Sequence, residues 1–287
     1  MNKIKKVLVT GSNGFIGTSL IKRLIGSSYE VITFDQENGD IAIDRLSFTG
    51  VDHVFHLASK VYVPASWENT FDFYQTNVMG TTNVLELCRA NNCALTYISS
   101  YVYGTPQYLP VDEKHPVFPA SPYNHSKLIA EDICRYYSQT FNIPVAILRP
   151  VNIYGSGQNT QFLIPTVIQQ SFGEDIKSIE VMDLRPKRDY LFIDDFVDAL
   201  VATFQNQGFE IYNVGSGYSV SVEEIIKTVL EQGNILKPYS AKNIERKNEI
   251  WDVYNDISKI EKLLNWKPKT SFKEGISQCI EAFKDKL

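Results

Sequence analysis

The first strand-like run of the chain is Val7-Leu8-Val9-Thr10-Gly11-Ser12-Asn13-Gly14-Phe15-Ile16-Gly17, in which a β-branched segment leads into three glycines at GxxGxxG spacing. An apolar pattern of helical period follows over residues 14–25. Glycines permit a tight turn and let a pyrophosphate approach the backbone, and a helix N-terminus offers free N–H groups to an anion. The spacing is common by itself, but its place between a strand and a helix predicts a dinucleotide-binding unit.

The rest of the first half repeats this alternation of apolar runs and helical patterns. We expect strands at residues 6–10, 30–34, 53–57, 94–99 and 144–148, and helices at 14–25, 70–90 and 123–141. Strands that alternate with helices predict right-handed βαβ units and a parallel sheet covered on both faces, which is an α/β fold of the Rossmann-type, doubly wound class. Such sheets bind ligands at the carboxyl ends of their strands.

In the second half the alternation of strand and helix patterns is less regular. This predicts a smaller lobe that shares strands with the first half. Strands are expected at 190–193 and 210–214, and helices at 221–230, 258–264 and 272–283. We therefore expect an NAD-binding Rossmann domain made of residues 1–153 with 189–214. Residues 154–188 with 215–287 would form a C-terminal α/β substrate lobe. The connection from 34 to 51 is short, and residues 41–48 could supply about two helical turns.

Composition and charge narrow the class of protein. The chain has 287 residues, 44% hydrophobic and 21% charged, with a net charge of -5, which is ordinary for a soluble protein without a general attraction for nucleic acid or anionic membranes. The four cysteines form no CxxC pair and the four histidines lack ligand spacing, so neither a metal nor a disulfide framework is predicted. No apolar run approaches ~18 residues and no signal peptide is recognisable, which predicts a cytoplasmic protein.

Asp35 ends the second strand-like run, about 20 residues beyond the glycine turn, where a carboxylate can accept a hydrogen bond from a ribose 2′-hydroxyl. The same charge would repel a 2′-phosphate, and no Arg or Lys occurs among the five residues that follow, Gln36-Glu37-Asn38-Gly39-Asp40. The sequence therefore favours NAD over NADP.

Tyr123 and Lys127 share one face of the helix expected after Ser121 and Pro122, which suit the cap and the first turn. A nearby ammonium favours the phenolate and is expected to lower the pKa of Tyr123. Such a tyrosine can exchange a proton with a substrate hydroxyl. Ser99, at the end of the fourth strand, can position the same oxygen, so we predict Ser99, Tyr123 and Lys127 as the catalytic group.

With these motifs the sequence resembles the NAD-dependent epimerase/dehydratase family of extended short-chain dehydrogenases, nearly end to end from residue 5 to about 283. Further matching pieces are Gly39-Asp40-Ile41, His56-Leu57-Ala58-Ser59, Thr76-Asn77-Val78-Met79-Gly80-Thr81, Leu148-Arg149-Pro150-Val151-Asn152-Ile153-Tyr154-Gly155, Arg188-Asp189-Tyr190 and Tyr212-Asn213-Val214-Gly215-Ser216-Gly217. The resemblance implies enzymes that act on nucleotide-activated sugars, and it implies a homodimer formed through the helices at 70–90 and 123–141. From the sequence, the apolar faces of those helices could equally cover the sheet.

The resemblance also implies roles for individual residues. The glycine turn would hold the pyrophosphate, Asp35 the adenosine ribose, Asp40 and Ile41 the adenine, and Lys127 the nicotinamide ribose. The full set of cofactor-binding residues is Gly11, Asn13, Gly14, Phe15, Ile16, Gly17, Asp35, Asp40, Ile41, Leu57, Ala58, Ser59, Tyr123 and Lys127. The implied substrate-binding residues are Ser99, Ser100, Tyr101, Asn152, Arg188 and Arg246, with both arginines near the diphosphate.

Departures from the family pattern narrow the reaction. Family dehydratases carry Asp and Glu directly after the catalytic threonine, and sugar-nucleotide decarboxylases carry a Glu there, whereas this chain has Ser100 and Tyr101. Three hypotheses follow: a sugar-nucleotide 4-epimerase that works through a transient 4-keto sugar, a 4-keto-sugar reductase that consumes NAD(P)H, and a non-catalytic NAD-sensing protein. Tyr218 replaces an arginine common after the Gly-Ser-Gly, which leaves the nucleotide base open.

Overall fold

The computed structural model describes residues 5–244 and 249–285. Its centre is a six-stranded parallel sheet in the order β10-β5-β4-β3-β1-β2. These strands are β1 Lys6–Thr10, β2 Glu30–Phe34, β3 His53–His56, β4 Ala94–Ile98, β5 Val145–Pro150 and β10 Phe209–Val214. Register follows the predicted runs, with Val9 beside Thr33 and Phe55. The predicted α/β architecture of the doubly wound type is confirmed.

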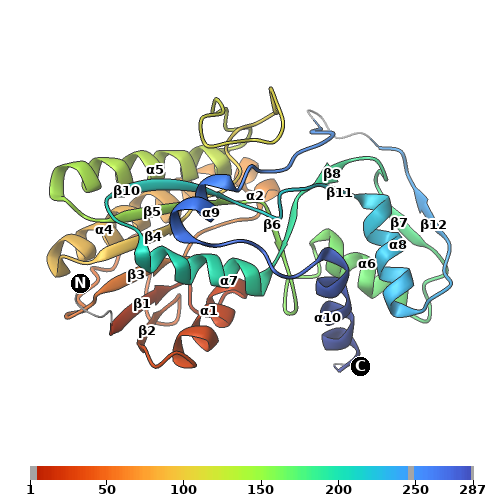
Figure 1. Cartoon of the computed structure of the whole chain (residues 1–287), viewed down its shortest axis with the longest axis horizontal. Coiled ribbons are helices and arrows are strands. Elements are labelled where there is room, and N and C mark those ends of the chain that lie inside the picture. Colours follow the sequence, from red (N-terminus) through yellow and green to blue (C-terminus); the bar gives the residue numbers. More distant parts are fainter. Residues whose placement is uncertain (1–4, 245–248, 286–287) are drawn as a thin grey trace.

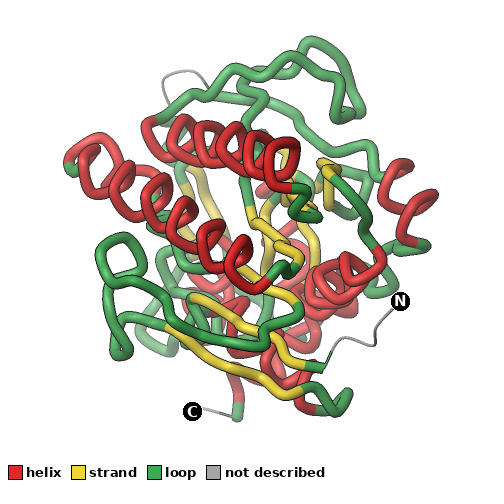
Figure 2. The backbone as a smooth tube through the Cα atoms, turned by 90° about the vertical axis from the view of Figure 1, so that its left-hand side faces the viewer, coloured by secondary structure: helices red, strands yellow, loops and turns green. Residues whose placement is uncertain are grey.

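Helices cover both faces of the sheet, as Figures 1 and 2 show. The first helices are α1 Phe15–Ile25, α2 Val63–Glu68, α3 Thr70–Tyr74, a π-helical turn η1 Gln75–Met79, α4 Gly80–Asn91, α5 Pro122–Phe141 and α7 Ile193–Ala202, followed by the 3₁₀ turn η2 Thr203–Gln205. Alternate residues of β1 enter different cores: Val7 and Val9 pack on the side of α1 and α7, and Leu8 on the side of α4 and α5. Strands apolar on both faces therefore read as continuous hydrophobic runs.

Most of the remaining elements gather at one end of the sheet, on the right of Figure 1, whereas α9 lies beside β10. They are β6 Asn152–Tyr154, α6 Leu163–Phe172, β7 Ile179–Val181, β8 Lys187–Arg188, β9 Tyr190–Phe192, β11 Val220–Ser221, α8 Val222–Gly233, β12 Tyr239–Ala241, α9 Ser258–Leu264 and α10 Phe272–Lys284. Three short two-stranded pairs join them: β6 with β9, β7 with β12, and β8 with β11. One buried cluster runs from Val9 of the sheet to Ile226 of α8 and Ile276 of α10, so both parts of the molecule share a core.

Two expectations about helices were wrong in detail. Residues 41–48 form turns and extended chain instead of two helical turns, because Ile41 and Leu46 are drawn into the core beneath α4. The predicted helix at 70–90 is divided into α3, η1 and α4. The sequence pattern also missed α6 and α7. Within the described residues, no helix is both long and apolar enough to cross a membrane.

Candidate active site

The glycine turn between β1 and α1 can only be built from glycines. Gly11 has φ +69°, and a Cβ atom placed there would lie 2.6 Å from the backbone nitrogen of Ala58. A Cβ atom on Gly17 would lie 2.3 Å from the carbonyl oxygen of Gly11. Both positions therefore exclude larger residues, the first by strain as well as by collision. This close packing keeps the turn free of side chains on the side where a pyrophosphate would approach.

The N-terminus of α1 completes this turn. Gly14 occupies the N-cap position and supplies no side-chain cap, and Phe15 and Ile16 begin the helix beside the exposed Asn13. The first N–H groups of a helix have no partner within it and lie at its positive end. An eleven-residue helix that starts at an uncapped glycine turn thus fits an anionic diphosphate.

Asp35 lies beside the turn at the end of β2. Its carboxylate accepts hydrogen bonds from the Ser12 hydroxyl at 2.7 Å and from the Glu37 N–H at 2.9 Å, and the side chain is partly exposed. A carboxylate has about four acceptor sites, so it can still bind a ribose hydroxyl. The two contacts hold the carboxylate in place, which agrees with its predicted position.

The residues implied to bind the adenine, Asp40 and Ile41, differ from each other in exposure, and the loop after β3 is partly exposed. Asp40 is exposed, and its carboxylate accepts from the Ala42 N–H at 2.8 Å. Ile41 is buried below Gly80, so its side chain belongs to the core and does not face the surface. Leu57, Ala58 and Ser59 follow β3, are partly exposed and lie against the glycine turn, with the Ala58 N–H donating to Thr10 Oγ1 at 3.3 Å.

Ser99 follows the last residue of β4, at the carboxyl edge of the sheet. Its N–H donates to the carbonyl of Leu148 on β5 at 2.8 Å, and its hydroxyl donates to Oε1 of Glu131 on α5. The side chain is 2% exposed. The structure therefore places Ser99 between β5 and the helix that carries Tyr123 and Lys127.

Ser121 caps α5 as predicted, accepting from the Asn124 N–H at 3.2 Å, with Pro122 in the first turn. Lys127 is buried, and its ammonium lies 4.7 Å from the centre of the Tyr97 ring. Burial lowers the pKa of Lys127 to about 7, against the opposing charges of Glu131 and Cys134. The side chain of Lys127 is therefore only partly protonated near neutral pH.

The sequence analysis predicted a lowered pKa for Tyr123. This direction was wrong for the protein without its cofactor. Burial raises the pKa of Tyr123 to about 12, and a hydrogen bond with Ser100 acts in the opposite direction. Burial also lowers the pKa of Lys127, the group expected to stabilise the phenolate. Sequence spacing placed the pair correctly but carried no information about its desolvation.

Ser100 and Tyr101 border the same site. Asn124 of α5 donates from its amide nitrogen to Ser100 Oγ at 3.2 Å and to the Tyr101 carbonyl at 3.0 Å. The Tyr101 hydroxyl donates to the Gly104 carbonyl at 2.8 Å, and burial raises its pKa. Asn124, which the sequence analysis did not select, thus ties the loop after β4 to the start of α5.

The other implied substrate-binding residues, Asn152, Arg188 and Arg246, follow β5 in the chain. Asn152 is exposed on β6, and its amide donates to the Asp189 carbonyl at 3.2 Å. The Arg188 guanidinium on β8 is already engaged by the Glu249 carboxylate at 2.5 Å and by the carbonyls of Lys187 and Ile250. Arg246 lies outside the described residues.

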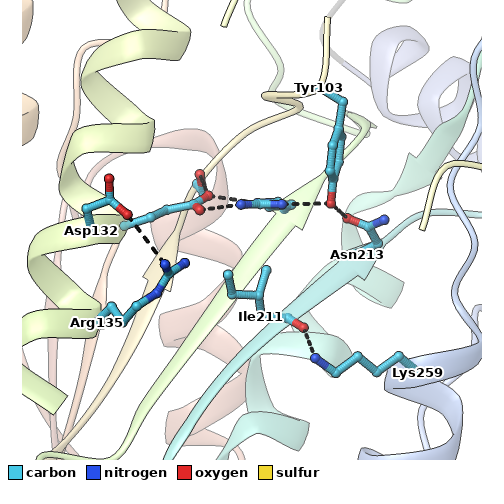
Figure 3. Close-up of polar contacts among 9 residues, drawn as sticks. Tyr103, Asp132, Arg135, Ile211, Asn213 and Lys259 are labelled. Atoms are coloured by element: carbon cyan, nitrogen blue, oxygen red, sulfur yellow. Dashed lines mark hydrogen bonds and ion pairs between the residues drawn. The ribbon is translucent and has the colours of Figure 1, made fainter. Parts of the chain in front are cut away.

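The sequence analysis missed a group of buried polar residues behind Ser99. Glu131 is fully buried and receives two hydrogen bonds from Arg149, from Nε at 2.9 Å and from Nη2 at 2.5 Å. Arg149 also donates to the Tyr103 hydroxyl at 2.9 Å, which in turn donates to Asn213 Oδ1 at 2.6 Å, a contact visible in Figure 3. The missed signal was spacing: Tyr123, Lys127 and Glu131 lie four residues apart on one helical face.

Comparison with known proteins identifies the family of this chain. The model of the NAD dependent epimerase/dehydratase family matches residues 7–215. The chain belongs to this family. A putative UDP-glucose 4-epimerase from Methanocaldococcus jannaschii is 32% identical over 303 residues, covering 97% of this chain and 98% of the relative.

Two solved structures share this fold over nearly the whole chain. UDP-glucose 4-epimerase from Bifidobacterium longum, in complex with NAD+ and UDP, has a TM-score of 0.87 at 26% identity and covers 98% of both chains. RMD from Pseudomonas aeruginosa, complexed with NADPH, has a TM-score of 0.90 at 26% identity and covers 99% of this chain and 100% of its own.

As a member of this family, the protein is an NAD-dependent enzyme of the sugar-nucleotide epimerase and dehydratase class. The hypothesis of a non-catalytic NAD sensor is therefore set aside. The residues present fit the cofactor: the glycine cradle would hold its diphosphate, Asp35 its ribose, and Lys127 the nicotinamide end. When bound, NAD supplies reversible two-electron oxidation of a sugar carbon.

Proposed function

We propose that this enzyme is a sugar-nucleotide 4-epimerase that acts on a UDP-sugar through a transient 4-keto intermediate. The observation that carries the proposal is the edge formed by Ser99, Tyr123 and Lys127, next to which Ser100 and Tyr101 stand in the places of a dehydratase's acid pair. Similarity to UDP-glucose 4-epimerases supports the substrate class.

In this proposal Tyr123 takes the proton of the C4 hydroxyl when the carbon is oxidised and returns a proton when it is reduced. Ser99 holds the same oxygen, and Lys127 binds the nicotinamide ribose. Burial raises the pKa of Tyr123, and a positive charge nearby, such as that of the oxidised nicotinamide, would lower it. Turning the keto sugar over would then expose its other face to the same cofactor.

Elimination of water is disfavoured because it needs an acid or a base beside the neighbouring carbons. Ser100 is held by Asn124, and the Tyr101 hydroxyl is directed to a backbone carbonyl. Glu131, the carboxylate that contacts Ser99, is fully buried and paired with Arg149. The 4-keto-sugar reductase remains the second candidate, supported by the similarity to an enzyme complexed with NADPH, whereas Asp35 favours NAD.

The test is product analysis of the purified enzyme with a panel of nucleotide sugars, beginning with UDP-glucose and UDP-galactose. Epimer formation without net production of reduced dinucleotide is expected. Tyr123→Phe should lower kcat by at least about 100-fold, because general acid–base catalysis is worth about 10²–10⁴. Stoichiometric oxidation of NADH by 4-keto sugars would contradict the epimerase and favour the reductase.

We also propose that the nucleotide end of the substrate binds between the two predicted domains, residues 1–153 with 189–214 and residues 154–188 with 215–287. A homodimer through the segment α3–η1–α4 and helix α5 is proposed from the family resemblance. It is supported by three large side chains left exposed on this part of the molecule, Phe71, Met79 and Tyr136. Size-exclusion chromatography with light scattering tests the dimer, while a cytoplasmic location stays a prediction.

A further inference from the structure

The hydroxyl of Ser99 is fixed from behind by a buried ion pair that no step of the proposed reaction uses. Oε1 of Glu131 accepts from both the Ser99 hydroxyl and Arg149 Nε, and Oε2 accepts from Arg149 Nη2. Side-chain exposure is 0% for Glu131 and 4% for Arg149. Ser99 is the donor in this contact, so its hydrogen is directed to Glu131.

The elements that hold this contact are the elements that build the site. Glu131 lies on α5, one turn beyond Lys127 and two beyond Tyr123, so any shift of Glu131 along the helix would move both. Arg149 follows Leu148 on β5, and the Leu148 carbonyl accepts the Ser99 N–H at 2.8 Å. Consecutive residues of β5 thus fix the backbone of Ser99 and the partner of its side chain.

We propose that Glu131 is a positioning residue that fixes the Ser99 hydroxyl beside the C4 oxygen of the substrate. This inference rests on the proposed function. The C4 hydroxyl has a single hydrogen, which goes to Tyr123, so Ser99 contacts the C4 oxygen as a donor once the sugar is oxidised. The oxygen of a keto sugar only accepts, so this contact requires the Ser99 hydrogen to turn from Glu131 to the substrate. Glu131 therefore holds Ser99 Oγ in the place from which this turn is made.

A double-mutant cycle separates this role from a general structural one. Glu131→Gln is expected to lower kcat for epimerisation by about 10- to 100-fold with little change in KM, because misplacement of a group by about 1 Å can cost 10²-fold. If Glu131 acts through Ser99, the same change in a Ser99→Ala background should cost less than about twofold, which is within the scatter with which the effects of independent substitutions add. An equal loss in both backgrounds, or no loss in the wild-type background, would overturn the inference.

Two further variants guard against loss of the fold. Glu131→Asp keeps the charge for Arg149 but is one methylene shorter, so it repeats the cycle if the glutamine variant does not fold. Asp195→Asn is the matched control, since Asp195 is a buried carboxylate of α7 that accepts from the Lys269 and Thr270 N–H groups and does not touch Ser99. It should lower the unfolding temperature and leave kcat unchanged.

Failure of the proposed function gives a different result. If the wild-type enzyme epimerises no sugar in the panel, the proposed function is wrong. The cycle is then measured on the affinity of the NAD-loaded protein for UDP-glucose by calorimetry. Coupling between Glu131 and Ser99 in that affinity still supports the inference, and additive changes overturn it.

Discussion

Two arginine–glutamate pairs occupy the two halves of this molecule and differ in what surrounds them. Arg149 and Glu131 lie between β5 and α5 with side chains 4% and 0% exposed. Arg188 and Glu249 lie at the substrate end with side chains 22% and 9% exposed. Each pair has an N–O distance of 2.5 Å, so contact geometry alone does not distinguish them.

The difference is whether a ligand could take the place of the glutamate. The inner pair is enclosed, and both Glu131 oxygens are used by protein donors. Glu249 of the outer pair lines a cavity of about 410 Å³ together with Tyr108 and Trp251. The inner pair therefore suits fixed geometry, and the outer pair suits an exchange of partners.

The largest difference should be in stability. Glu131→Ala leaves the Arg149 charge buried and unpaired, which should reduce the free energy of unfolding by about 3–5 kcal/mol. Glu249→Ala leaves Arg188 with access to water and two carbonyl partners, and should cost about 1 kcal/mol or less. Urea unfolding of both variants measures the difference. Equal losses would show that exposure does not separate the pairs.

The sequence predicted those parts of the fold and the site that depend on a few consecutive residues. Periodicity located the strands of the central sheet, and the glycine turn, Asp35, Ser99 and the Tyr123–Lys127 spacing all fall at the expected edge. These features are local, because a turn, a cap or a helical face is encoded within a few consecutive residues. Family resemblance then supplied the reaction class.

What the sequence did not predict depends on contacts between distant segments. Glu131 and Arg149 are 18 residues apart, and a charge on a helix ordinarily predicts a solvated face. The role of Arg188 in the substrate lobe stays a prediction, and its partner Glu249 is 61 residues away. The pKa of Tyr123 was assigned the wrong direction because the extent of burial depends on packing that no local pattern reports.

Lys127 offers a second way to probe the inner region, through pH. Its pKa is about 7 in the folded protein and ~10.4 when unfolded, so between these values the unfolded chain binds more protons and stability rises with pH. Lys127→Met removes this dependence. The variant should be more stable than wild type at about pH 7, by at most a few kcal/mol at about 1.4 kcal/mol per pKa unit, and the gap should close toward pH ~10.

Urea unfolding at both pH values, with NAD removed from both proteins, measures this gap without a contribution from cofactor binding. The other titrating groups are common to both proteins, so their contributions cancel in the difference. A stability difference that stays constant with pH would mean that Lys127 keeps an ordinary pKa in the folded protein. Lys127 and Arg149 would then both stay positively charged in the protein interior.

The smallest effects are expected for UDP binding at the outer pair. Substitution of Arg188 should weaken binding, and substitution of Glu249 should strengthen it. Arg188→Leu should weaken UDP binding by about 10- to 100-fold, since a hydrogen bond to a charged group is worth about 1.5–3 kcal/mol. Glu249→Gln removes the carboxylate that competes with the diphosphate, and should strengthen binding by a few-fold. Calorimetric titration of the NAD-loaded protein with UDP measures both, and Lys187→Gln is the control on the same strand. If Glu249→Gln weakens binding instead, Glu249 orients Arg188 for the ligand, and the outer pair is as fixed as the inner one.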